Sequence, residues 1–288
     1  MSTQNEIKDP NDPSVRFLYG TSFGRAILEL CLALKVPAIL GAFLRSPFSH
    51  FYIKKFIAKN KIDMTDFLDY AEAGQGGKKK FRTFNDFFTR KKPASSLSFD
   101  SAVENLISPC DSLLSVFKIN SDSVFRVKEF DYSLRDFFET DEFNEKFVGG
   151  DCLIFRLCAT DYHRFCFIDS GSQGENHFIE GKLYSVQPVA CENFRVYTKN
   201  RRSWAILKTE NFGDVAQIEV GAFSVGGIVN HVQNGAFKKG DEKGFFDLHG
   251  STIVLLFEKN KIRLDENVKP KDGEEIRVKY GQKIGQKA

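Results

Sequence analysis

The sequence lacks several features that would assign a protein to a class at once. Tryptophan occurs once, and the six cysteines form no Cys-x-x-Cys pair, which argues against a structural zinc site. The segment from Met1 to Pro13 is polar and has no apolar run like that of a signal peptide, so we expect reduced cysteines in a cytoplasmic compartment. The net charge is only +3, and the longest basic cluster is Lys78-Lys79-Lys80, so nucleic-acid binding is not predicted.

The sequence also lacks an uninterrupted apolar run long enough to span a membrane. A spanning helix needs about 20 predominantly apolar residues. The run from Ala26 to Leu44 is interrupted by two charges, Pro37 and Gly41. We therefore predict helices on either side of Pro37, and a third helix near residues 51–58 with lysines on its polar side.

Two interpretations of these helices remain open from the residues alone. In the first, an apolar face lies in a membrane interface while Arg45, Lys54, Lys55 and Lys59 meet anionic lipid, each contributing roughly 1 kcal/mol. In the second, the helices form a cap that packs on the core of the protein's own domain.

From about residue 100 onward, the chain consists of short apolar runs separated by Gly, Asp and Asn. Examples are SLLSVFKI, DCLIFRLC, GKLYSV, SWAILKT, VAQIEVGAF and STIVLLFEK, while EFDYSLRDFFE is typical of a short helix. The predicted fold class is α+β: N-terminal helices followed by a mainly antiparallel β sandwich or partial barrel. A boundary near residue 75, in a glycine-rich basic loop, would separate a helical region (1–75) from a β-rich domain (76–288).

A glycine and a serine stand at the head of the last strong strand pattern, as Gly250-Ser251. They either form a turn or mark a peptide bond that the protein cuts itself. A serine hydroxyl can attack the preceding carbonyl if the backbone is strained and a base takes the proton, and glycine permits the required conformations. The resulting ester can eliminate and hydrolyse, which leaves a pyruvoyl cap.

Three further residues are candidates for chemistry, and each has a structural alternative. His163 follows Asp-Tyr at a predicted strand edge and is a candidate general acid or base. Cys166 is either a nucleophile or a small buried apolar residue. Asp111 lies in a turn after Pro109, where it can cap the backbone or orient a catalytic histidine.

Six segments, in this order, resemble the phosphatidylserine decarboxylase family. They are FNDFF.R (84–90), SP.D (108–111), DYHRF (161–165), GKLYSV (181–186), NFGDVAQIEVGAFSVGGI (211–228) and GSTIVLLFE (250–258). The resemblance covers about residues 80–262, and it favours cleavage over a turn at Gly250-Ser251.

The resemblance implies a proenzyme that cleaves itself between Gly250 and Ser251. Ser251, the nucleophile, would become a covalent pyruvoyl group, and no metal or diffusible cofactor would be needed. The pyruvoyl carbonyl would bind the amine of phosphatidylserine and take up the electrons left by carbon dioxide, giving phosphatidylethanolamine. The β chain (Met1 to Gly250) and the α chain (Ser251 to Ala288) would remain associated.

The chain departs from the family pattern D-Y-H-R-x-H, because Cys166 stands at the second histidine. In the family, that histidine belongs to an Asp-His-Ser triad for cleavage, in which Asp111 matches the aspartate. His163 matches the first histidine, which acts on the substrate. We hypothesise that His249 or His163 replaces the missing base; a Cys166 thiolate is a further option, although an ordinary thiol has a pKa of about 8.5.

A lipid substrate favours the interfacial interpretation of the N-terminal helices. We therefore expect a peripheral protein on the cytoplasmic face of a membrane, bound to an anionic lipid surface. Two alternatives stay open: a divergent homologue that no longer cuts itself and binds a lipid or partner, and a pyruvoyl decarboxylase of a soluble amino acid.

Overall fold

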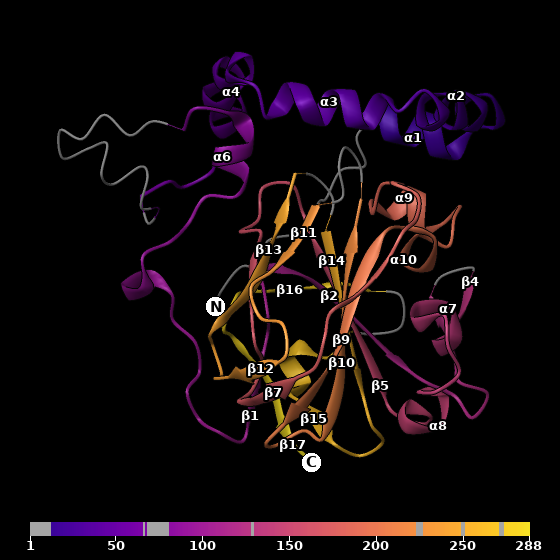
Figure 1. Cartoon of the computed structure of the whole chain (residues 1–288), viewed down its shortest axis with the longest axis vertical. Helices are drawn as coiled ribbons and strands as arrows, with labels where there is room; N and C mark the ends of the chain where they lie inside the picture. Colours follow the sequence, from indigo (N-terminus) through magenta and orange to yellow (C-terminus); the bar gives the residue numbers. More distant parts are fainter. Residues whose placement is uncertain are drawn as a thin grey trace.

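A layer of N-terminal helices lies across one end of the β strands (Figure 1). The computed structural model describes residues 13–65, 67, 81–127, 130–222, 227–248, 251–270 and 274–288. The helical layer consists of α1 (Pro13–Gly20), α2 (Ser22–Ala33), α3 (Val36–Leu44), the 3-10 turn Pro47–Ser49 and α4 (His50–Asn60).

The break between α2 and α3 lies two residues before the predicted position. Lys35 adopts a left-handed conformation with φ of 54°, whereas Pro37 lies within the first turn of α3. Proline is accommodated there because the first turn needs no backbone donor. Within the described residues, no single helix is long and apolar enough to cross a membrane; α2 and Val36–Arg45 pass that test only as a pair bent by 63°.

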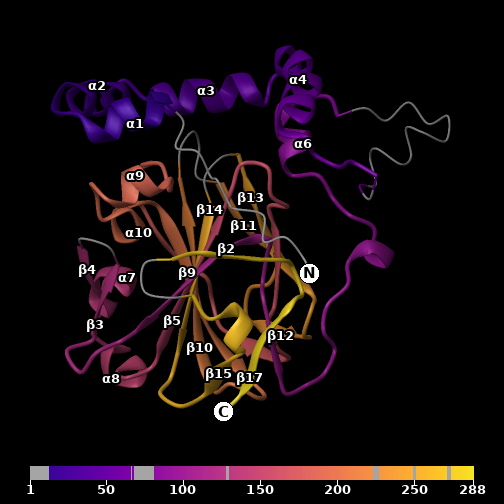
Figure 2. The ribbon, with the colours of Figure 1, turned by 180° about the vertical axis from the view of Figure 1, so that it is seen from behind.

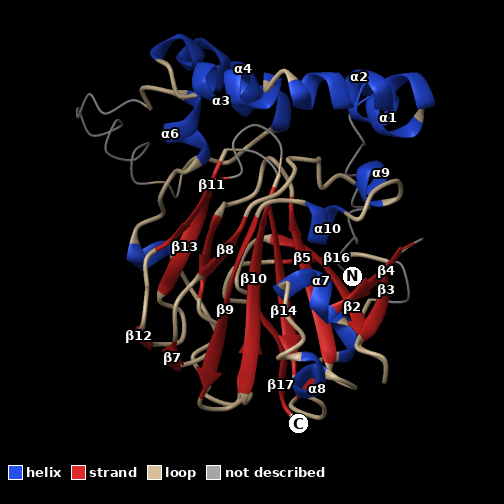
Figure 3. Ribbon diagram, turned by 45° about the vertical axis from the view of Figure 1, so that its right-hand side comes forward, coloured by secondary structure: helices blue, strands red, loops and turns tan. Residues whose placement is uncertain are grey.

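A nine-stranded antiparallel sheet forms the centre of the molecule (Figure 3). Its order is β12-β7-β9-β10-β14-β5-β2-β16, and β8 also pairs with β9. The strands are β2 (Ser112–Lys118), β5 (Asp151–Leu157), β7 (Gly171–Gln173), β8 (His177–Ile179), β9 (Arg202–Thr209), β10 (Asp214–Gly221), β12 (Gly235–Phe237), β14 (Ser251–Phe257) and β16 (Ile276–Val278). β14 is an interior strand, hydrogen-bonded along its length to β10 and β5.

Smaller sheets and short helices complete the β-rich part. Two three-stranded sheets have the orders β11-β13-β6 and β1-β17-β15, and β3 pairs with β4. The strands are β1 (Asn105–Ile107), β3 (Val124–Val127), β4 (Phe130–Ser133), β6 (Arg164–Cys166), β11 (Gly227–Asn230), β13 (Glu242–Asp247), β15 (Ile262–Leu264) and β17 (Lys283–Lys287). The helices are α6 (Phe84–Phe88), α7 (Leu134–Phe138), α8 (Asn144–Phe147), α9 (Pro188–Cys191) and α10 (Val196–Lys199), with 3-10 turns at Ala94–Ser96 and Glu266–Val268.

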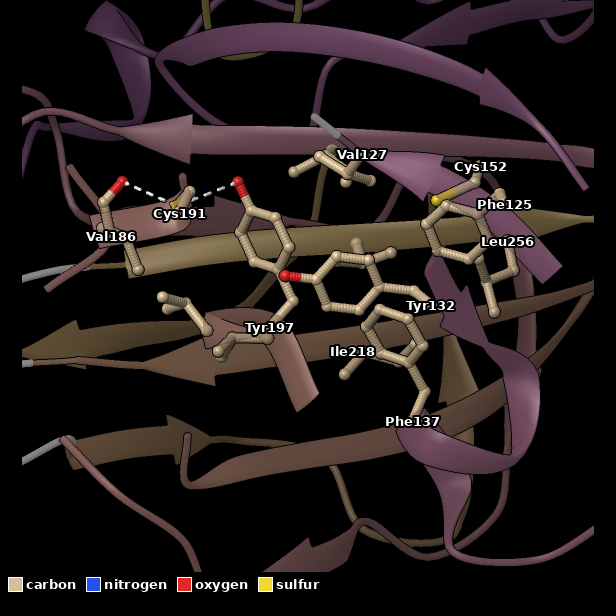
Figure 4. Packing of buried hydrophobic residues seen from close by; sticks show 14 of the residues in the cluster. Phe125, Val127, Tyr132, Phe137, Cys152, Val186, Cys191, Tyr197, Ile218 and Leu256 are labelled. Carbon is tan, nitrogen blue, oxygen red and sulfur yellow. Dashed lines mark hydrogen bonds between the residues drawn. The ribbon is translucent and has the colours of Figure 1, made fainter. Parts of the chain in front are cut away.

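The central sheet is buried on both faces. Side chains alternate along a strand, so Val254 and Leu256 of β14 enter one core while Ile253 and Leu255 enter another. The first core is closed by aromatic side chains, including Tyr132 (Figure 4). Burial on both faces explains why IVLLF, from Ile253 to Phe257, is continuously apolar instead of alternating.

A third core joins the helical layer to the β-rich part. It includes residues of α4 and α6, which lie at one end of the helical layer (Figure 2). It is rich in phenylalanine, and it contains residues of α3, α4 and α6 together with two from the β-rich part. Its buried members are Leu44, Ile53, Met64, Phe67, Phe81, Phe84, Phe87, Phe88, Tyr162 and Leu248. Helix α6 begins directly after Thr83, because Thr83 and Asp86 form a capping box.

The predicted α+β class is confirmed, with N-terminal helices and mainly antiparallel sheets. Two local predictions were only partly right. GKLYSV forms no strand and contributes one isolated bridge at Lys182, and residues 130–139 divide into β4 and α7 because Ser133 caps the helix. The boundary near residue 75 falls in 68–80, outside the described residues, and stays a prediction.

Candidate active site

Ser251 is the first residue of β14, and it is fully buried. In the ladder it lies opposite Gly221 of β10 on one side and Leu157 of β5 on the other. Among the described residues, its Oγ has no hydrogen-bond partner. Leaving a buried hydroxyl unpaired lowers the free energy of unfolding by roughly 1–3 kcal/mol. Stability therefore does not explain a serine at this position, and a functional role does. The other cleavage-site residue, Gly250, and the candidate base His249 lie outside the described residues.

The side chain of Ser251 belongs to the face of the sheet that β6 and β13 cover. By strand alternation, Ser251 shares this face with Ile253. Ile253 packs in the same core as Phe165 of β6 and Phe246 of β13. The serine and the DYHRF motif, distant in sequence, are therefore placed on facing layers.

His163 immediately precedes β6, and its side chain is buried. Its Nδ1 lies 2.9 Å from the backbone oxygen of Asp161. Because a carbonyl oxygen only accepts hydrogen bonds, Nδ1 carries a hydrogen, and Nε2 of the neutral ring keeps a lone pair. The ring packs on Phe88 with 3.9 Å between centroids, which fixes its plane. In this tautomer, Nε2 is the ring nitrogen that can accept a proton.

Two arginines bind the α6 segment to the DYHRF segment. Arg90 Nη2 donates to the backbone oxygens of Thr160 and Asp161, at 2.9 and 3.1 Å. Arg164 Nη2 donates back to the oxygen of Thr89 at 2.9 Å. These contacts bring two of the sequence motifs, FNDFF.R and DYHRF, into one unit around His163.

Asp161 is held by Arg277, a contact that the sequence did not predict. Arg277 Nη1 lies 2.8–2.9 Å from both carboxylate oxygens, and the backbone N–H of Cys158 donates to Oδ2 at 2.8 Å. Burial raises the pKa of Asp161, and the guanidinium of Arg277 opposes that rise. The two residues are far apart in sequence, so no local pattern could have paired them.

Cys166, at the end of β6, is completely buried. Its Sγ donates to the backbone oxygen of Pro109 at 3.5 Å. Burial raises the pKa of its thiol to about 12. The thiol therefore stays protonated near neutral pH, which weighs against a Cys166 thiolate as the cleavage base.

Asp111 hydrogen-bonds to the segment after β16. Its Oδ1 accepts from the backbone N–H of Tyr280 at 2.9 Å, and its Oδ2 lies 3.3 Å from Lys279 Nζ. Within the described part of the chain, no hydrogen bond joins Asp111 to His163 or Cys166. Asp111 lines a cavity of about 310 Å³ that Asp161 also lines.

Comparison with known proteins decides the family. The family model described as phosphatidylserine decarboxylase matches residues 84–286. The chain belongs to the phosphatidylserine decarboxylase family. It is 40% identical over 282 residues to "Phosphatidylserine decarboxylase proenzyme 2" of Clostridium acetobutylicum, which covers 97% of this chain and 94% of that protein. The resemblance found in the six motifs is confirmed, and with it the enzyme class, a carboxy-lyase.

Other relatives carry the same name. The phosphatidylserine decarboxylase proenzyme of Clostridium tetani is 42% identical over 254 residues, covering 86% of this chain and 83% of that protein. The one from Desulfitobacterium hafniense is 38% identical over 284 residues, covering 96% and 93%. Since the similarity extends well beyond the predicted motifs, it includes the N-terminal helices.

Against the phosphatidylserine decarboxylase pattern, the candidate residues fall into two groups. Ser251 and the DYHRF segment that contains His163 lie on facing layers, and both side chains are buried. Cys166 contacts the backbone oxygen of Pro109, two residues before Asp111, but among the described residues Cys166 and Asp111 do not hydrogen-bond to each other. An imidazole can donate one N–H to an aspartate and accept a proton at its other nitrogen, whereas a thiol has only one weak donor. The identity of the cleavage base therefore stays a prediction.

The structure also contains a buried ion pair near Ser251, between Lys243 and Glu219, which the sequence did not predict. Lys243 Nζ of β13 lies 2.8 Å from Glu219 Oε1 of β10, and both side chains are fully buried. Lys243 also donates to Asn230 Oδ1 at 2.8 Å. Burial lowers the pKa of Lys243, while Glu219 opposes the change. Glu219 precedes Gly221 by two residues, so the network joins the small sheet to the central sheet beside Ser251.

The described residues include no group of three or more His, Cys, Asp or Glu side chains that could hold a metal ion.

Proposed function

We propose that this family member is a phosphatidylserine decarboxylase proenzyme that cuts its own chain between Gly250 and Ser251. The mature protein would convert phosphatidylserine to phosphatidylethanolamine and carbon dioxide. The family supports the overall reaction. The observation that carries the proposal is the buried hydroxyl of Ser251 at the head of an interior strand, for which the described residues supply no hydrogen-bond partner.

Self-cleavage would begin when a base removes the proton of Ser251 Oγ. The oxygen attacks the carbonyl carbon of Gly250, the peptide C–N bond breaks, and the nitrogen of Ser251 takes up a proton. Loss of the Cα proton then expels the carboxylate of Gly250 and leaves dehydroalanine. Water converts this group to a pyruvoyl group and releases ammonia. His249 and His163 remain the candidate bases.

The surroundings of Ser251 fit a covalent pyruvoyl group, because the position is dry and the group needs no additional ligand. Such a group supplies a carbonyl that accepts the electrons left when carbon dioxide departs. His163 is the residue best prepared for the accompanying proton transfer. Its Nε2 would hold the proton that replaces the carboxylate on the substrate Cα, since Nδ1 is committed to Asp161.

The arrangement of strands supports lasting association of the two chains. The α chain would contribute β14, which pairs with both β10 and β5, and also β16 and β17, which pair with β2 and β1. Among the described residues, three ion pairs cross between the chains: Arg156 with Glu275 at 2.6 Å, Arg277 with Asp161 at 2.8 Å, and Lys279 with Asp111 at 3.3 Å. Separation would break the central sheet on both sides of β14.

Exposed apolar side chains on α1–α4 support membrane binding. All but three of the exposed large hydrophobic side chains of the described residues lie between positions 17 and 52. They are Phe17, Phe23, Leu30, Leu34, Val36, Ile39, Phe43, Phe48, Phe51 and Tyr52. Phe48 and Phe51 are 76% and 73% exposed, which a folded monomer rarely tolerates without a partner surface. We call this set the apolar face.

Basic residues near the apolar face support an anionic membrane, hence the cytoplasmic leaflet. Lys54, Lys55 and Lys59 of α4 are exposed, as an interfacial role requires. Arg45 differs from the three lysines, because its guanidinium pairs with Asp247 of β13. We therefore propose a protein that lies on the cytoplasmic face with α1–α4 in the interface.

Intact-mass measurement of the purified protein tests the proposal. We expect two fragments divided between Gly250 and Ser251, with a blocked N-terminus on the smaller one, and a single uncut chain for Ser251→Ala. Carbon dioxide release from phosphatidylserine vesicles, compared with release from free serine, distinguishes the lipid from a soluble amino acid. An intact wild-type chain that releases no carbon dioxide would instead indicate a non-cleaving homologue.

A further inference from the structure

The helical layer contacts the strand that leads into the proposed cleavage site. Arg45 caps the C-terminus of α3, and its Nη2 lies 2.5 Å from Oδ2 of Asp247. Asp247 is the last residue of β13, and three residues separate it from Ser251. The pair is partly shielded from water, with side-chain exposures of 35% and 20%. It joins an element of the apolar face directly to the segment before the cut.

The next residue, Leu248, has an unusual backbone. Its φ is 51°, in the left-handed region that a branched, non-glycine residue seldom adopts. Its side chain is 1% exposed and packs in the same core as Leu44, the neighbour of Arg45. Backbone strain of this kind persists only where the surroundings impose it, and it is concentrated at functional sites. At Leu248, the surroundings include α3, α4 and α6, whose side chains share its core.

The scissile segment is thus bracketed by two fixed points. On one side, Asp247 and Leu248 are held by Arg45 and the core around Leu44. On the other side, Ser251 is fixed by ladders to β10 and β5. Only two residues lie between Leu248 and Ser251, so the position of each end limits where the Gly250 carbonyl can lie relative to the serine hydroxyl.

We propose that Arg45, Asp247 and Leu248 are positioning residues for self-cleavage, which makes the lipid-facing helical layer part of the cleavage apparatus. The inference rests on the proposed function. These residues take no part in bond making or breaking; they act through the backbone by holding the carbonyl of Gly250 in reach of Ser251 Oγ. A misplacement of about 1 Å can slow a reaction by about a hundredfold. Loss of the Arg45–Asp247 ion pair or of the packing of Leu248 should therefore have a measurable effect on the rate of cleavage.

The test is a time course of cleavage after synthesis of the full chain, followed by gel or intact mass. Arg45→Gln and Asp247→Asn are each expected to slow cleavage by about three- to thirtyfold. The exchanged pair Arg45→Asp with Asp247→Arg should recover most of the wild-type rate, which general destabilisation would not produce. Leu248→Ala, which keeps a β-carbon but loses packing, should also slow cleavage.

A matched control is the ion pair between Lys182 and Glu29 at 3.7 Å, which joins the helical layer to the β-rich part through α2. Lys182→Gln should cleave at the wild-type rate. The inference is overturned if Arg45→Gln and Asp247→Asn cleave as fast as a wild type that does cut itself, or if the exchanged pair is as slow as the single variants. A wild type that never cuts would instead remove the proposed function.

Discussion

Removing the charge of Glu219 should destabilise the protein strongly, because Glu219 and Lys243 form an ion pair with no exposure to solvent. In Glu219→Gln, the ammonium of Lys243 would keep only neutral acceptors, chiefly Asn230 Oδ1 at 2.8 Å and Asn176 Oδ1 at 3.4 Å. Breaking a buried pair by removing one partner lowers the free energy of unfolding by about 3–5 kcal/mol.

The expected shift in melting temperature follows from the size of the protein. Unfolding entropy is about 2.1 cal/mol/K per residue, so a chain of 288 residues has an unfolding entropy of about 0.6 kcal/mol/K. A loss of 3–5 kcal/mol therefore lowers the melting temperature by about 5–8 °C. Calorimetry of wild type and variant, with the state of cleavage checked by mass, measures this shift.

Two matched variants sharpen the assay. Glu180→Gln breaks an exposed ion pair with Arg201, which contributes at most about 1 kcal/mol, and should lower the melting temperature by less than about 2 °C. Replacing both buried partners, with Glu219→Leu and Lys243→Met, should recover most of the loss, since no unpaired charge remains buried. If Glu219→Gln melts with the wild type, or no lower than the double variant, the assignment of a buried charged pair is wrong.

Three further outcomes are expected. His163→Ala should lower decarboxylation by about 10²- to 10⁴-fold per cleaved chain, measured as carbon dioxide release; an unchanged rate would exclude proton transfer by this ring. Phe51→Ser should weaken sedimentation with anionic vesicles by about tenfold or more, since burying a phenylalanine contributes about 1.5–3 kcal/mol, whereas Phe178→Ser, at a phenylalanine of β8 that is 52% exposed, should leave it unchanged. Because burial raises the pKa of Cys166 to about 12, native protein at pH 8 should leave this thiol unalkylated; rapid labelling would contradict its burial.

The elements with strong local signals could be predicted from the sequence. The apolar residues of STIVLLF, Ile253 to Phe257, indicated the strand that the structure shows as β14. GKLYSV misled because its apolar residues pack as an irregular segment: Tyr184 hydrogen-bonds through its backbone to the side chain of Asn200 and not to a strand. Local composition does not reveal such tertiary contacts.

The candidate site also contains residues that local sequence motifs identified and contacts that they did not. The motifs identified Ser251 and His163 as candidates, and the structure shows that both side chains are buried, while their roles stay predictions. The contacts of Arg277, Lys243 and Arg45 join residues that are far apart in sequence. A single sequence contains no spacing that encodes such pairs, so only the folded chain reveals them.

The end of the central sheet that carries Ser251 is also the end at which Leu248 packs with the helices. A bilayer resting on the apolar face would therefore be close to the reacting atoms. Under that arrangement, only the polar head of a two-tailed lipid has to rise from the leaflet, while its acyl chains stay among their neighbours. Supply of reactant and removal of product would then occur by lateral diffusion, with no extraction of a whole lipid into water.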